Sequence, residues 1–193
     1  MQIQSLSQRK REAVRRELTV IAVDLFARDG YEQTTVDAIA EAAGMSKRTF
    51  FRYYASKDDV VIGKWQTMGD DIVTRFRGRA ADEPLIDALR AALDVVVEHY
   101  ADTARQSASS AFDRIIAETP QLSARFLYEV STIEQRLAAE AAETRPEIPP
   151  LRLRALVGAV GACLLAAMAD VLPEHPEGLG RALDHVLAET VVR

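Results

Sequence analysis

A basic island between Ser46 and Lys57 is the part of this chain whose residue types and spacing could do chemistry. It holds four basic residues and no acidic one, although the whole chain has a net charge of −5. Lys47, Arg48 and Thr49 follow directly after Ser46, a residue type that caps helices. Cationic and hydroxyl side chains at the start of a short exposed helix suit the phosphates and base edges of duplex DNA. The island therefore favours a nucleic-acid contact.

The elements that must position this island read as two short helices joined by a glycine turn. Thr34 and Asp37 have the spacing of a capping box for the first of them. Gly44 permits the left-handed backbone that the turn needs. The longer helix before them carries one apolar stripe and is expected to stop at Gly30. Nearly every other segment also has helical periodicity, so the sequence predicts an all-α fold.

The charge of the chain is divided unevenly. Residues 1–57 carry ten Lys/Arg and seven Asp/Glu, a balance of +3, whereas residues 58–193 carry fourteen against twenty-two, a balance of −8. This asymmetry indicates an N-terminal module that faces a polyanion and a remainder that does not. We expect a helix-turn-helix domain over residues 1–57 and a helical regulatory and dimerisation domain over residues 58–193.

Catalytic and metal sites are not expected. The three histidines, His99, His175 and His185, have no metal-ligand spacing, and neither a phosphate loop nor a nucleophile elbow is present in the sequence. The single cysteine, Cys163, lies in an apolar segment, where a buried inert thiol is the default reading. The uncharged run 155–169 is shorter than the ~20 residues of a membrane helix. We expect a cytoplasmic protein that is not an enzyme and holds neither a cofactor nor a metal.

The residues around the island also carry a family resemblance. Phe26 with Gly30, followed by TTVDAIAEAAGMSKRTFFRYYASKDDVV, resembles the N-terminal domain of the tetracycline-repressor (TetR) family over roughly residues 9–60. The resemblance implies a bacterial, DNA-binding transcriptional regulator. It also implies a three-helix helix-turn-helix domain, a C-terminal helical domain for ligand binding and dimerisation, and about nine helices in all.

Two positions depart from the family pattern. Phe51 stands where many members have Tyr, and Tyr54 stands where Phe is usual. Phe51 lacks the hydroxyl that often contacts a phosphate, so Tyr53 becomes the expected aromatic donor. By matching position, the resemblance implies DNA contacts from Thr35, Ser46, Lys47, Arg48, Thr49, Tyr53 and Lys57.

The expected contacts differ in what they could read. Arg48 is the best candidate for guanine because its forked guanidinium matches the O6 and N7 acceptors, and Thr49 could meet a thymine methyl. Each could equally be a backbone contact. The residues Thr35, Tyr53 and Lys57 are expected at phosphates. A basic set upstream could reach phosphates or the minor groove, or could be only a solvated helix end; it consists of Arg9, Lys10, Arg11, Arg15 and Arg16.

The C-terminal body resembles the family by architecture alone. Residues 151–172 form the most apolar segment, and residues 179–191 supply a last helix. In this family the last two long helices usually form a four-helix dimer interface; the alternative is an intramolecular core helix. The residues expected at the interface are Gly158, Gly161, Leu165, Leu183 and Leu187. A two-fold dimer would place two reading helices about 34–36 Å apart, which predicts a near-palindromic double-stranded operator.

A ligand pocket is expected between the middle helices. Its candidate lining is apolar and consists of Trp65, Met68, Tyr100, Phe112, Ile116 and Phe126. Such residues are more often plain core, but an apolar lining favours a small hydrophobic effector, such as an acyl chain carried as a thioester or an aromatic drug. The sequence thus predicts a ligand-responsive regulator. It does not encode whether that regulator activates or represses, and we adopt repression as the hypothesis because it is the commoner behaviour of the family that the chain resembles.

Two other classes of protein compete with this reading. An enzyme would need the catalytic spacing that is missing here. An interaction protein that has lost DNA binding would have no need of the basic island, and the presence of Lys47, Arg48 and Tyr53 argues against it.

Overall fold

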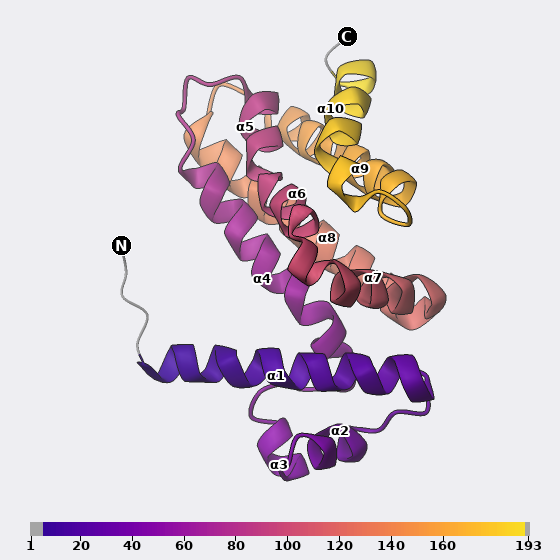
Figure 1. The fold of residues 1–193 in the computed structure, drawn as a ribbon. Helices are drawn as coiled ribbons and strands as arrows, with labels where there is room; N and C mark the ends of the chain where they lie inside the picture. Colours follow the sequence, from indigo (N-terminus) through magenta and orange to yellow (C-terminus); the bar gives the residue numbers. More distant parts are fainter. Residues whose placement is uncertain (1–5, 192–193) are drawn as a thin grey trace. The chain divides into compact units, whose positions relative to one another are not determined.

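The computed structural model describes residues 6–191, and all regular structure in that range is helical (Figure 1). The described residues form ten α-helices and one short 3-10 helix, where about nine helices were expected. The all-α class is confirmed. The described chain separates into two compact units. The first holds the described residues up to Lys64 together with 111–124, and the second holds 65–110 and the described residues from Arg125 onward. The boundary expected after residue 57 stays a prediction.

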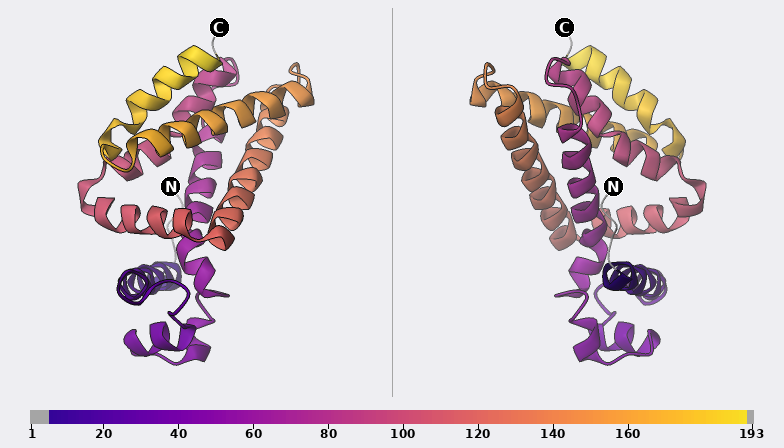
Figure 2. Two further views of the ribbon diagram at one scale, coloured as in Figure 1. Left: turned by 90° about the vertical axis from the view of Figure 1, so that its right-hand side faces the viewer. Right: turned by 90° about the vertical axis from the view of Figure 1, so that its left-hand side faces the viewer.

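The first unit is built on the long helix α1 (Leu6–Asp29) and the short helices α2 (Val36–Ala42) and α3 (Lys47–Phe50). Figures 1 and 2 show α2 and α3 side by side. The predicted apolar stripe of α1 is buried, including Leu18 and Phe26. Gly30 ends this helix at a φ of 89°, and its N–H donates to the Phe26 carbonyl at 3.0 Å. Burial of the stripe is what holds these short helices, because isolated helices of this length are unstable in water.

The caps of α2 and α3 set their first turns. Ser46 is the N-cap of α3 as predicted, and its Oγ accepts the Thr49 N–H at 3.2 Å. The N-cap of α2 is Thr35, whose Oγ1 accepts the Ala38 N–H at 3.1 Å. The capping box predicted from Thr34 is wrong, because the buried Thr34 hydroxyl donates to the Gly30 carbonyl at 2.8 Å. The two adjacent threonines thus have different roles: Thr35 caps α2, and Thr34 bonds to the backbone of the turn after α1.

The first unit also contains helical ends that come from later in the chain. They are the start of α4 (Lys57–Arg77), the end of α7 (Thr103–Glu118) and the start of α8 (Pro120–Thr144). Each of these helices continues into residues of the second unit.

The second unit adds four α-helices and the 3-10 helix. These are α5 (Leu85–Ala92), α6 (Asp94–Ala101), α9 (Pro150–Val171), η1 (Pro176–Gly178) and α10 (Leu179–Thr190). Helix α9 packs against α5 and α10, and Figure 2 shows α9 and α10 next to each other. The apolar run that follows Pro84 divides into two helices at Leu93, which ends α5 and begins α6.

Helix α9 is the most apolar helix of the described chain. Among residues 6–191 it is the one helix long and apolar enough to cross a membrane, with a mean hydropathy of 1.7 over an 18-residue window. The uncharged-run criterion missed it, since Arg152 and Arg154 interrupt only its first turns. Its buried side chains, such as Val157 and Leu164, belong to the core of the second unit. One such helix is weak evidence for a membrane, and a core helix of a soluble protein passes the same test.

Candidate nucleic-acid interface and effector cavity

The start of α3 presents the basic island to solvent. Lys47 and Arg48 are exposed, while Phe50, on the opposite side of the same helix, is completely buried. Phe50 packs against Tyr54 with 6.0 Å between ring centroids. The turn before α3 contains Gly44 at a φ of 63°, a conformation that L side chains rarely adopt. A buried aromatic anchor and a fixed turn therefore hold two cationic side chains at one exposed helix end.

The two cations differ in their partners. Lys47 Nζ lies 2.8 Å from Asp37 Oδ2, and both side chains are exposed. Arg48 has neither a hydrogen bond nor an ion pair within the described part of the chain. Thr49 Oγ1 shares a 2.9 Å hydrogen bond with the Ser46 hydroxyl. Arg48 is thus the cation of α3 whose five donors are all available for a bidentate partner.

The hydroxyl groups expected at phosphates keep a donor. Thr35 Oγ1 accepts a backbone N–H, which leaves its own O–H for a phosphate oxygen. Tyr53 is half-exposed, and the described residues supply no hydrogen-bond partner for it. Phe51, with 47% of its surface exposed, lies beside it and has no polar atom to offer. The expectation that Tyr53 replaces it stays a prediction.

The basic residues of α1 border the same region. Arg11 Nη2 donates to the Arg52 carbonyl at 3.3 Å, and the Arg15 guanidinium carbon lies 4.6 Å from the centroid of the Tyr54 ring. These contacts tie α1 to the segment just after α3. The side chain of Arg9 lies outside the described part of the structure. The phosphate role of the α1 set stays a prediction.

Lys57 is engaged inside the protein. Its Nζ donates to the carbonyls of Tyr31 at 2.7 Å, Glu32 at 3.3 Å and Thr34 at 3.3 Å. It also lies 4.2 Å from the centroid of the Tyr31 ring. An ammonium has three donors, so these carbonyls use all of them. A phosphate contact would require Lys57 to give up part of this set, and the geometry favours a role in positioning the segment between α1 and α2.

Comparison with known proteins agrees with this arrangement. The model of the family described as bacterial regulatory proteins, tetR family, matches residues 18–62, which include α2, α3 and the basic island. A regulator of Streptomyces glaucescens, the HTH-type transcriptional regulator TcmR, is 34% identical over 137 residues. The chain belongs to the TetR family. Both matches describe regulatory proteins, and the part of this chain that the family model covers contains the basic island.

The curated relatives match only part of the chain in sequence, whereas the solved structures match most of it in fold. The match covers 69% of this chain and 61% of TcmR, and a match to the regulator MftR of Mycobacterium tuberculosis is 35% identical and covers 60% of this chain and 58% of MftR. A SmeT–triclosan complex superposes with a TM-score of 0.62 at 17% identity, covering 92% of this chain and 91% of that one. FadR of Thermus thermophilus, in complex with lauroyl-CoA, gives 0.53 at 21%, covering 92% and 93%. These structures share the fold.

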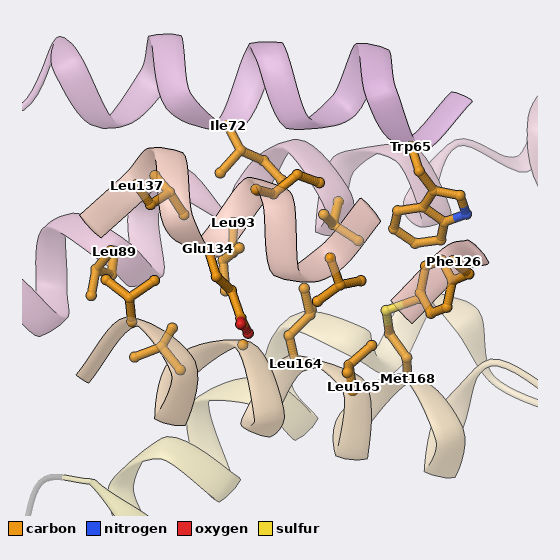
Figure 3. A pocket seen from close by; sticks show the side chains of 16 residues that line it. Trp65, Ile72, Leu89, Leu93, Phe126, Glu134, Leu137, Leu164, Leu165 and Met168 are labelled. Carbon is orange, nitrogen blue, oxygen red and sulfur yellow. The ribbon is translucent and has the colours of Figure 1, made fainter. Parts of the chain in front are cut away.

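The second unit of this TetR-family regulator contains a small apolar cavity of about 50 Å³. Side chains of α4, α5, α6, α8 and α9 and the Leu93 junction line it, and Figure 3 shows the lining side chains converging on it. Trp65 and Phe126, two of the residues predicted from the sequence, form part of the lining, and their ring centroids are 4.8 Å apart. Ligand pockets for drug-sized molecules are usually about 300–1,000 Å³, so this cavity is smaller than such a molecule needs.

The other predicted lining residues lie elsewhere. Met68 and Tyr100 are buried in the second unit but are not part of the cavity wall. Phe112 and Ile116 are buried in the first unit, where the end of α7 belongs. Any contact of these four residues with an effector stays a prediction.

Sequence reasoning missed most of the lining, including the one charged residue among the described residues of the wall, Glu134 of α8. Its carboxyl group lies among apolar side chains in the cavity (Figure 3), and burial raises its pKa above the ordinary value. It has neither a hydrogen bond nor an ion pair within the described residues. The signal was present in the sequence, because Glu134 lies four residues after Val130 and therefore on the inward stripe of α8.

The expected dimer residues fall into two groups. Leu183 and Leu187 of α10 are 0% and 4% exposed in the single chain, so a second copy cannot reach them in this conformation. Gly161 and Leu165 of α9 line the cavity. Gly158 is half-buried, and a Cβ added to it would meet nothing within 4 Å. Of the expected set, Gly158 is the position that keeps open space beside it.

Three polar pairs tie the helical ends within the first unit. Asp58 of α4 accepts the Tyr31 hydroxyl through Oδ1, and its Oδ2 accepts Gln121 Nε2 of α8 at 3.0 Å. Lys64 Nζ of α4 lies 2.9 Å from Asp113 Oδ1 of α7. Burial lowers the pKa of Lys64, and the adjacent Asp113 carboxylate opposes that effect. The start of α4 is therefore bonded to α8 and to α7 as well as to the segment after α1.

Proposed function

We propose that this TetR-family regulator is a repressor that binds a near-palindromic operator as a homodimer and is released by a small hydrophobic effector. Repression would arise because the bound dimer blocks polymerase access to the promoter. We place the protein in the bacterial cytoplasm, where its operator and its effector meet. The effector acts by binding more tightly to a conformation that fits the operator poorly.

The exposed start of α3 is the observation that carries this proposal. Arg48 is exposed and unpaired within the described chain, and its guanidinium suits the O6 and N7 acceptors of guanine. Lys47 and Thr49 are proposed at neighbouring base edges. Thr35 and Tyr53 are proposed at phosphates, and Ser46 orients α3 as its cap. The buried Phe50 beneath them supports a rigid reading surface.

The proposal of a homodimer rests on the outer side of α9. Small residues on that side are exposed, among them Ala162, Ala166 and Ala169, and Gly158 has open space beside it. Small side chains allow two helices to approach closely. A two-fold axis through this surface would give paired reading helices about 34–36 Å apart, which is one turn of DNA.

The proposal of a hydrophobic effector rests on the cavity of the second unit. Its wall is almost wholly apolar, with the Trp65 and Phe126 rings in contact. Two proteins of the same fold are described with ligands that have an apolar part, SmeT with the aromatic compound triclosan and FadR with lauroyl-CoA, which carries an acyl chain. Both an aromatic and an acyl ligand are therefore compatible with a helical body of this kind.

Selection of random duplex DNA by the purified protein tests the proposal. We expect an enriched inverted repeat whose affinity falls steeply with salt. Arg48→Ala should weaken binding to that repeat by about 1–3 kcal/mol and relax the base preference at one position of each half-site. Arg181→Ala, which removes an exposed arginine of α10, is the matched control and should bind as the wild type does.

Tyr53→Phe tests the aromatic phosphate contact, with Tyr128→Phe as control because Tyr128 is 73% exposed on α8. We expect a loss of about 1 kcal/mol for the first variant and none for the second. Unchanged binding in both Arg48→Ala and Tyr53→Phe would overturn these contact assignments. Failure to enrich any repeat, even after unfolding and refolding to remove a bound molecule, would favour an interaction protein that does not read DNA.

A further inference from the structure

Glu134 is the one charged side chain in the wall of the effector cavity, as far as the described residues go. Figure 3 shows it extending from α8 into the space between α4, α5 and α9, with apolar side chains on either side. The remaining wall consists of aliphatic and aromatic groups, Met168 and Gly161. A carboxylate in such surroundings loses hydration without receiving compensation from the protein, because neither a hydrogen bond nor an ion pair within the described chain reaches it.

The local packing leaves room for this carboxyl group. A Cβ placed on Gly161 of α9 would overlap Glu134 Oε1. The glycine therefore allows the carboxyl group to lie against the α9 backbone, where any larger residue would push it aside. The chain thus combines an unpaired carboxyl group with a glycine that accommodates it, which is the arrangement expected where a ligand supplies the missing partner.

We propose that the effector is a hydrophobic molecule with a single ammonium-type cation, and that Glu134 binds that cation while the apolar wall takes the rest. This inference rests on the proposed effector-binding function and names its ligand class. An N–H⁺ group satisfies a carboxylate with a short charge-assisted hydrogen bond. A carboxylate ligand of the same length would be repelled, and a neutral alcohol would gain only an uncharged donor.

The composition of the cavity wall also limits the ligand to a single charge. Because Glu134 is the single charged residue in the described wall, a second charge on the buried part of the ligand would remain unpaired, which is unfavourable. The aromatic faces of Trp65 and Phe126 add a surface on which a cation is favoured over an anion.

Trp65 provides the measurement, since it is the single tryptophan of the chain and lines the cavity. The full-length protein is titrated with decylammonium, 1-decanol and decanoate, each below its aggregation limit, while tryptophan fluorescence is recorded. We expect decylammonium to bind at least about tenfold more tightly than 1-decanol, which corresponds to 1.4 kcal/mol. Decanoate should bind most weakly of the three.

Glu134→Gln keeps the shape of the side chain and removes its charge, so decylammonium and 1-decanol should then bind within about twofold of each other. Glu143→Gln, an exposed glutamate of the same helix, is the matched control and should keep the tenfold preference. The preference for decylammonium over 1-decanol is measured on the wild type, so it tests the inference even if Glu134→Gln is unstable.

The possible outcomes separate this inference from the proposed function. Equal binding of decylammonium and 1-decanol by the wild type overturns the cation inference and leaves a hydrophobic effector in place. If none of the three probes changes the tryptophan fluorescence, the inference is overturned as well. A tenfold preference that vanishes in Glu134→Gln, without any release of operator DNA by decylammonium, supports the cation site and contradicts the proposed release mechanism.

Discussion

Gln121 Nε2 donates to Asp58 Oδ2 across 3.0 Å, which joins the second residue of α8 to the second residue of α4. The other oxygen of Asp58 accepts the hydroxyl of Tyr31, which follows α1. Helix α8 also carries Glu134 in its later turns. One helix thus bears both an effector-cavity residue and a bond to the segment that supports the helix-turn-helix.

Gln121→Leu should weaken communication between effector and DNA. The change removes the amide donor, so a shift of α8 is no longer transmitted to Asp58 by that bond. We expect effector binding, followed by Trp65 fluorescence, to stay within about twofold of the wild type. The fall in operator affinity caused by effector, typically 5- to 150-fold in allosteric proteins, should shrink to less than half of its wild-type free energy.

Gln135→Leu is the control for this change, because Gln135 is an exposed amide on the same helix, and within the described residues its side chain bonds to Ser131 alone, at 3.3 Å. Operator affinity is measured by fluorescence anisotropy with and without effector. A full effector response in Gln121→Leu would show that the coupling runs through other contacts.

Glu134→Gln should stabilise the protein at neutral pH. Burial raises the pKa of Glu134 above its ordinary 4.5, so the folded protein holds this proton at a pH where the unfolded chain has lost it. The contribution of this group to stability is therefore complete below pH 4.5 and is lost as pH rises through the raised pKa. The glutamine of Glu134→Gln does not ionise, so the variant does not lose this stability as pH rises.

Urea unfolding at a series of pH values checks the prediction. The free energy of unfolding of Glu134→Gln should exceed that of the wild type at pH 7.5, and the two should converge near pH 4. Glu143→Gln, at an exposed site, should follow the wild-type curve at every pH. A wild type that gains stability relative to Glu134→Gln as pH rises would contradict the assignment.

Lys57→Met should lower stability more than it alters the salt dependence of DNA binding. The variant leaves three carbonyls, those of Tyr31, Glu32 and Thr34, without their donor. Hydrogen bonds to a charged group contribute about 1.5–3 kcal/mol, so we expect a loss of about 2 kcal/mol in the free energy of unfolding. The slope of log K against log salt should remain unchanged.

Lys47→Met provides the contrast for this experiment. It removes an exposed cation of α3 that faces the DNA in the proposed complex, so the salt slope should fall with little change in stability. If Lys57→Met instead loses that slope and keeps its stability, Lys57 is a phosphate contact as the family resemblance implies.

Asp37→Asn should tighten binding to duplex DNA of any sequence. The Asp37 carboxylate lies 2.8 Å from Lys47 Nζ, so it both neutralises that cation and repels phosphates. Exposed ion pairs contribute about 0–1 kcal/mol, which gives an expected gain of up to about fivefold. Asp24→Asn, an exposed aspartate of α1, is the control. Anisotropy with an operator and with a scrambled duplex should show the same gain, and a gain confined to the operator would point to a change in base reading.

The helix-turn-helix could be predicted closely because its signals are local. Ser46 and Gly44 have roles that follow from residue type and from neighbours within a few positions. The error at Thr34 has a local cause too, since two adjacent threonines could each cap α2 and a hydrogen bond to the Gly30 carbonyl decides between them.

The cavity could be predicted only in part because its wall comes from distant segments. Trp65 and Phe126 were identifiable as apolar stripe residues, but nothing local separates them from Phe112, which is buried in the first unit. The end of α7, which carries Phe112, is paired with distant residues of the first unit. An example is the hydrogen bond between Lys64 and Asp113, which are 49 positions apart in the chain. Glu134 was missed because a search for an apolar lining passes over a charged residue on the same stripe.

The cavity of about 50 Å³ also bears on how much effector a cell must accumulate before it responds. The proposed effector would bind here only after the helices had separated, so its apparent dissociation constant would be the intrinsic one divided by the small fraction of open protein. That fraction acts as a dose threshold. Substitutions in the wall that ease or resist opening would move the threshold without touching the ligand, which gives a lineage a simple way to reset its sensitivity to the same compound.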